Sequence, residues 1–200
     1  MCHLDEAGFA PTLPTSYTWS RIGQRYTVDY EAPQGRRVNT IGAYVTHGPA
    51  AGQLVQRSFV ALPRSKSKKA DAAPAQRRPI HAERLIEFLW LLAGRPTDAP
   101  VGWVRERPLA VWMDNYSVHT AAEVKAAAPT LAAAGITLHY LPPYSPELSG
   151  IEPIWQDVKY RGMRRRSYTS VEELQQEVDA ALTRKAATLR ETALSLVATA

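Results

Sequence analysis

Three acidic residues stand where an apolar stretch or a turn-rich loop meets the next element of the chain. Asp114 directly follows the apolar run LAVWM, Glu152 follows the loop sequence PPYSPELSG, and Asp5 follows an apolar residue near the N-terminus. Hard cations such as Mg²⁺ and Mn²⁺ prefer carboxylate ligands, and carboxylates from separate elements can hold two ions about 4 Å apart. We therefore expect a site for phosphoryl chemistry, in which one ion activates water or a 3′-hydroxyl and the other stabilises the leaving oxygen.

Neighbouring acids are weaker candidates for the same site. Asp114 is expected at the carboxyl edge of a sheet, where α/β proteins bind ligands, and Glu152 in the first turn of a helix, where amide groups favour negative charge. Glu6 neighbours Asp5, but alternation along a strand predicts that it points to the opposite face. Asp157 comes after Glu152 by about 140° around the same helix and is expected to face elsewhere.

The elements that must position these acids differ between the two halves of the chain. In the first half, segments rich in β-branched and aromatic residues predict an antiparallel meander over 17–19, 26–30, 39–46 and 54–61. Residues 63–79 are basic, rich in small residues and flanked by prolines, which predicts a loop inside the domain.

The second half alternates between strand and helix patterns. Helices are predicted over 81–93 and 120–134, from about 151, and from a cap at 169–170 towards 189, with buried strands over 109–113 and 136–141. Pro129 is expected to kink or divide the second of these helices. Antiparallel strands followed by strand–helix–strand units predict an α/β fold with one mixed sheet flanked by helices.

Basic residues gather in clusters within a chain of formal net charge +5. The clusters cover 64–69, 77–78 and 159–166. Such clusters lower the free energy of a nearby phosphate backbone and release its counterions, although a solvated face is the alternative. Because the last cluster follows the helix of Glu152, we predict that it contacts DNA through Lys159, Arg161, Arg164, Arg165 and Arg166.

The segments VWMDNYSVH and LPPYSPELSGIEPIW together resemble the bacterial insertion-sequence branch of the mariner-like DDE transposases. That family carries its second acid in an Asp-Asn-x-x-x-His segment, matched by Asp114, Asn115 and His119. It carries its third in a Pro-x-x-Ser-Pro-(acid)-Leu-x-x-Ile-Glu stretch that ends here at Glu152. The early sequence LDEAGF fits the first motif and supplies Asp5.

This resemblance implies an RNase H-like five-stranded sheet with the three acids as catalytic metal ligands, holding two Mg²⁺ or Mn²⁺ ions. It implies nicking of DNA at the ends of a mobile element, followed by attack of the 3′-hydroxyl on target DNA, by a homodimer. Asn115 and His119 are expected to order Asp114 or to contact DNA, with a purely structural hydrogen bond as the alternative.

Two departures from the family pattern open alternatives. Ser149-Gly150 replaces an Asn-Pro pair and loosens the backbone before Glu152, since glycine costs more entropy to order. The helix-turn-helix region of the family is absent, so we expect an upstream-encoded partner segment or a truncated copy. The alternatives to a transposase are a hydrolytic nuclease of the same fold and a degenerate fragment that binds DNA without turnover.

We expect one catalytic domain over 1–192, with 63–79 as its internal loop and 193–200 as a C-terminal tail. The single cysteine, Cys2, excludes an intramolecular disulfide and a cysteine-based zinc site. No run of about 18 apolar residues suggests a membrane span, and the first residues lack a signal-peptide pattern. A cytoplasmic location is therefore expected.

Overall fold

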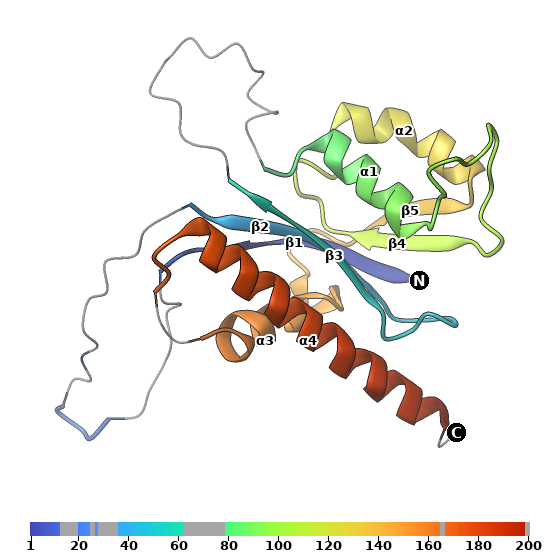
Figure 1. Cartoon of the computed structure of the whole chain (residues 1–200). Helices are drawn as coiled ribbons and strands as arrows, with labels where there is room; N and C mark the ends of the chain where they lie inside the picture. Colours follow the sequence, from blue (N-terminus) through green and yellow to red (C-terminus); the bar gives the residue numbers. More distant parts are fainter. Residues whose placement is uncertain (13–19, 25–26, 28–35, 62–78, 165–166, 199–200) are drawn as a thin grey trace, which may run out of the picture.

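A five-stranded mixed sheet forms the centre of the structure (Figure 1). In the order β3-β2-β1-β4-β5, its strands are β3 Leu54–Val60, β2 Val38–Val45, β1 Cys2–Phe9, β4 Leu109–Met113 and β5 Ile136–Tyr140. The pairs β1–β2 and β2–β3 are antiparallel, and β1–β4 and β4–β5 are parallel. The predicted α/β class with one mixed sheet is confirmed.

The computed structural model describes residues 1–12, 20–24, 27, 36–61, 79–164 and 167–198. The strand predicted over 17–19 and the basic clusters at 64–69 and 77–78 lie outside these residues, as do Arg165 and Arg166. Nearly all of the strand predicted over 26–30 and of the basic loop predicted over 63–79 lies outside them too.

Two layers of helices cover the sheet (Figure 1). Helices α1 (Ala82–Leu92) and α2 (Ala122–Ala133) lie on one face, and α3 (Glu152–Asp157) and α4 (Val171–Ala198) on the other. Each face has its own core, and β1 contributes to both because successive side chains of a strand point in opposite directions. Leu4 packs towards α1, whereas Ala7 and Phe9 pack with α3 and α4.

The first strand is longer than the short one that the sequence predicts. It runs to Phe9, whereas β4 ends at Met113. The parallel pairing of Cys2 with Val111 and of His3 with Trp112 sets the register. Continued by two residues along both strands, this register brings Asp5 level with Asp114. At this point β4 has ended and β1 continues.

The helix α2 is a single uninterrupted element although it contains Pro129, so of the two predicted effects of this proline, a kink or a division, the division does not occur. A proline inside a helix removes one backbone hydrogen bond. Val124 and Leu131, before and after it, are both fully buried, and their packing against the core holds the helix together.

The last helix begins where the cap sequence predicts and continues beyond the predicted end near Leu189. Ser170 Oγ accepts a hydrogen bond from the Glu173 amide at 3.1 Å, and a Glu173 carboxylate oxygen accepts one from the Thr169 amide at 3.0 Å. Residues 193–198 are helical. Arg190 donates to the carbonyl oxygen of Ala51 at 3.1 Å, which ties the distal half of α4 to the β2–β3 turn.

Within the described residues, no helix combines the length and the apolar character that crossing a membrane requires.

Candidate active site

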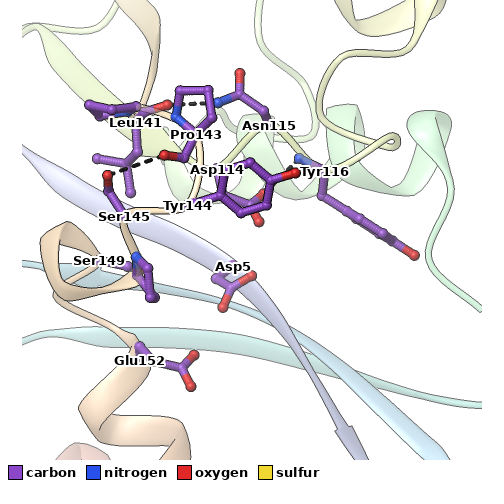
Figure 2. Close-up of a pocket in the computed structure, with 12 residues that line it drawn as sticks. Asp5, Asp114, Asn115, Tyr116, Leu141, Pro143, Tyr144, Ser145, Ser149 and Glu152 are labelled. Carbon is purple, nitrogen blue, oxygen red and sulfur yellow. Dashed lines mark hydrogen bonds between the residues drawn. The ribbon is translucent and has the colours of Figure 1, made fainter.

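A pocket of about 480 Å³ lies beyond the carboxyl end of β4, and three acidic residues line it (Figure 2). Asp5 comes from β1, Asp114 from the end of β4, and Glu152 from the first turn of α3. The rest of the lining comes from Asn115, Tyr116 and residues of the loop between Leu141 and Ser149. The structure therefore brings the three predicted acids to one site.

Glu152 reaches this pocket because α3 is packed tightly on the sheet. Trp155 follows Glu152 by about one helical turn, and only 1% of its surface is exposed. Its ring lies over Gly42, where an added Cβ atom would approach Trp155 Cη2 to 2.6 Å. Since Gly42 is the register partner of Asp5, the absence of a side chain at this position lets α3 place Glu152 beside Asp5.

Asn115 joins the two loops that form the upper wall of the pocket in Figure 2. Its side-chain amide donates a hydrogen bond to the carbonyl oxygen of Leu141 at 2.7 Å. The backbone amide of Leu141 in turn donates to the carbonyl oxygen of Met113 at 2.8 Å. Beyond Leu141, Tyr144 adopts a positive φ of 57°, and residues Pro146–Leu148 form the short 3₁₀ helix η2. Asn115 thus fixes the loop between β5 and α3 against the end of β4.

His119 lies fully buried behind Asp114 and contacts two acids. Its Nδ1 is 2.8 Å from Asp114 Oδ1, which also accepts a hydrogen bond from the Tyr116 amide at 2.9 Å. Its Nε2 is 3.3 Å from Glu6 Oε1, a close ionic contact that lacks the alignment of a hydrogen bond. Glu6 points to the face of β1 opposite to Asp5, as alternation predicts, and its contact with His119 is one that the sequence analysis missed.

Burial and mutual charge shift the pKa values of this group. The hydrogen bond from His119 is the largest cause that lowers the pKa of Asp114. Burial is the largest cause that raises the pKa of Asp5 to about 7, and the charge of Asp114 raises it further. A hydrogen bond from the backbone of Glu6 acts in the opposite direction and lowers this pKa. Burial alone would lower the pKa of His119, but the contacts with Asp114 and Glu6 outweigh it and raise this pKa to about 10.

The three acids have the ligand chemistry that a divalent cation prefers, but their side chains do not form a closed metal site in this structure. In the part of the chain that the structure describes, no three His, Cys, Asp or Glu side chains stand close enough to hold a metal ion. The donor set is nevertheless made of hard oxygens. Burial and the nearby charge of Asp114 both disfavour the ionised form of Asp5. A cation bound in the pocket would favour this ionised form.

The basic cluster after α3 divides between two sides of the molecule. Lys159 and Arg164 line a second pocket together with Arg37. Arg161 instead pairs with Asp157 at 3.1 Å, and Asp157 also binds Lys185 of α4 at 2.7 Å. Asp157 therefore faces α4 and not the pocket of Glu152. The sequence does not single out Arg37, because the Arg36-Arg37 pair is short and lies apart from the other basic clusters.

The family model of the DDE superfamily endonucleases matches residues 68–175. The chain belongs to this family. The matched region includes Asp114 and Glu152, whereas Asp5 precedes it. The predicted membership of the DDE family is thus confirmed. No curated protein matches the chain.

Solved transposase structures share the fold of this chain. The Mos1 mariner paired-end complex with Mn superposes with a TM-score of 0.58 at 15% identity, covering 95% of this chain and 52% of that one. The Mos1 strand transfer complex gives 0.56 at 16% identity, covering 99% and 53%. The RNase H-like fold is confirmed, and the chain spans about half the length of these Mos1 chains.

Proposed function

We propose that this chain is the catalytic domain of a transposase of the bacterial insertion-sequence branch, cleaving DNA at element ends and joining them to target DNA. The observation that carries the proposal is the pocket in which Asp5, Asp114 and Glu152 meet from three separate elements. Family membership supports DNA as the substrate, and similar folds occur in a Mos1 complex with a transposon end and in a strand transfer complex.

The three carboxylates would hold two Mg²⁺ or Mn²⁺ ions. When bound, such ions activate the attacking water or 3′-hydroxyl and stabilise charge on the leaving oxygen. The protein's part is to keep the acids in place. His119 and the Tyr116 amide hold Asp114 ionised and oriented, and the packing of Trp155 holds Glu152 opposite Asp5.

The assembly on DNA follows the same analogy. We propose that the chain acts as a homodimer on the element ends and that a helix-turn-helix segment encoded upstream supplies recognition of those ends. Of the predicted DNA contacts, Lys159 and Arg164 lie in the pocket at the end of β1, and Arg161 is exposed beside α4.

The test is nicking of a supercoiled plasmid in Mg²⁺ by the purified chain and by the variants Asp5→Asn, Asp114→Asn and Glu152→Gln. Bound metal ions supply several kcal/mol of transition-state stabilisation, which is lost when a ligand no longer holds them, and each 1.36 kcal/mol is tenfold in rate. We therefore expect a loss on the order of 10³-fold for each variant. Glu147→Gln, an exposed acid of the neighbouring loop outside the pocket, is the matched control and is expected to nick like wild type.

An assay for the joining of two DNA molecules distinguishes a transposase from a hydrolytic nuclease and from a degenerate fragment. Incubation of the chain with a labelled oligonucleotide ending in a 3′-hydroxyl and with plasmid should yield labelled, joined plasmid. Nicking without joining would instead identify a hydrolytic nuclease of this fold. DNA binding with neither nicking nor joining would identify a degenerate fragment, and nicking that survives Asp114→Asn would contradict both enzymatic assignments.

A further inference from the structure

A pocket of about 360 Å³ at the end of β1 holds three cationic side chains. Arg37 reaches it from the segment before β2, and Lys159 and Arg164 reach it from the segment after α3. We call it the Arg37 pocket. Phe9 and Tyr168 form part of its apolar wall. Each basic side chain offers only hydrogen-bond donors, so the pocket suits a ligand that is anionic and accepts hydrogen bonds.

Arg37 also belongs to the neighbouring pocket that contains Asp5 and Asp114. It therefore stands between the acidic site and the two other cations, Lys159 and Arg164. Along β1, the four steps from Asp5 to Phe9 span about 13 Å at roughly 3.3 Å per residue. This length matches a few nucleotides of duplex DNA, each of which advances about 3.4 Å along the helix axis.

The position of Arg37 depends on the glycine beneath it. A Cβ atom at Gly8 would approach Arg37 Nη2 to 2.5 Å, so the guanidinium lies directly over the bare backbone of β1. The side chain is exposed, and among the described residues it forms no ion pair with a carboxylate. Its charge is consequently available to an anion that approaches the acids from this side.

One of the three cations of the Arg37 pocket is already paired within the protein. Arg164 lies over the Tyr168 ring at 4.4 Å, but its charge is shared with Glu173 at 2.6 Å. Arg37 and Lys159 therefore supply the net positive charge.

We propose that the Arg37 pocket binds the DNA backbone a few nucleotides from the scissile phosphate, with Arg37 linking this backbone site to the catalytic acids. The inference rests on the proposed function and adds to it the path that the DNA strand takes over β1. Phosphate contacts of this kind set the register of DNA on a protein without reading its sequence. The variants should accordingly weaken binding equally for DNA of different sequences.

The experiment measures binding of a fluorescein-labelled DNA duplex by anisotropy without divalent metal, at several salt concentrations. Arg37→Gln and Lys159→Gln are each expected to weaken binding about fivefold and to reduce the slope of log K against log salt by about 1. Lys125→Gln is the matched control, because Lys125 is an exposed residue of α2 and lines neither of the pockets to which Arg37 belongs. It removes the same charge far from the pocket and should bind like wild type.

A second variant separates position from charge. Gly8→Ala keeps the net charge but displaces the guanidinium of Arg37, and it is expected to weaken binding while the thermal unfolding midpoint stays near that of wild type. The inference is overturned if wild type binds and nicks DNA while Arg37→Gln and Gly8→Ala behave like Lys125→Gln. The proposed function itself fails if wild type neither binds nor nicks DNA.

Discussion

At the level of single residues, Asp114 is held by its neighbours before any cation arrives. His119 and the Tyr116 amide both donate to the same carboxylate oxygen. His119 is in turn braced from the opposite side by Glu6. The two consecutive acids of β1 therefore serve different purposes, since Asp5 faces the pocket and Glu6 positions the imidazole that orients Asp114.

Replacement of Glu6 tests this positioning role. Glu6→Gln removes the charge opposite His119 Nε2 but keeps the shape of the side chain, so His119 should hold Asp114 less firmly. Residues that orient a metal ligand typically change metal affinity or activity 10- to 100-fold, and we expect a shift of about that size in the Mg²⁺ concentration that supports half-maximal nicking. The measurement is a Mg²⁺ titration of plasmid nicking.

Glu123→Gln provides the control for this variant, because Glu123 is an exposed acid in the first turn of α2. An unchanged Mg²⁺ requirement in Glu6→Gln would show that the contact with His119 is only structural.

At the level of secondary structure, the site depends on how closely α3 approaches the sheet. Trp155 and Gly42 set that approach, and the short helix then places Glu152 at its first turn. The π-helical turn η3 (Val158–Gly162) continues directly from α3 and carries Lys159 towards the Arg37 pocket. The contact between Trp155 and Gly42 thus positions both the carboxylate of Glu152 and the cationic side chain of Lys159.

Gly42→Ala should disturb this arrangement. The new Cβ would meet a buried indole that cannot move without displacing α3. Overpacking of a core typically costs about 1–3 kcal/mol, so we expect the free energy of unfolding to fall by that amount. Nicking should fall more than stability accounts for, because Glu152 is displaced. Urea denaturation and plasmid nicking measure the two effects.

The same substitution at Gly162 is the control, since a Cβ there would meet its nearest neighbour at an ordinary 3.7 Å. Equal stability and activity in the two variants would exclude the packing of Trp155 on Gly42 as the determinant of the position of Glu152.

For the whole molecule, charges join the helical elements of the layer that contains α3 and α4. Asp157 at the end of α3 binds Lys185 of α4 and Arg161 of η3. The hydrogen bond from Lys185 is the largest cause that holds the pKa of Asp157 below its usual range. Because this pKa is lowered by folding, the ionised pair stabilises the protein at neutral pH, and the contribution is lost as pH falls through the folded-state pKa.

Asp157→Asn should therefore lower the free energy of unfolding at pH 7 by about 0.2–1 kcal/mol, the range typical of solvent-exposed ion pairs. The difference from wild type should disappear at acid pH, once Asp157 is protonated in both folded and unfolded chains. Denaturant unfolding at a series of pH values measures this, with Asp98→Asn in an exposed loop as the control. A difference that persists at low pH would rule out the ionic origin.

The sequence alone determined the elements whose signals are local. The apolar run of β4 and the boundaries of β2, β3 and α1 were predicted to within one or two residues, because strand and helix patterns depend on neighbouring residues. The motifs around Asp114 and Glu152 likewise predicted a family that the comparisons confirm. Pro129 does not divide α2, because tertiary packing outweighs one missing backbone hydrogen bond.

Which residues meet at the site depends on long-range contacts that the sequence does not show. The length of β1 and its register with β4 place Asp5 level with Asp114, and the bare backbone at Gly42 admits Trp155. The fold also separates Arg161 from Lys159 and brings in the distant Arg37. These outcomes depend on contacts between residues far apart in the chain. Strand register and helix docking set such contacts, and neither leaves a periodic signal in the local sequence.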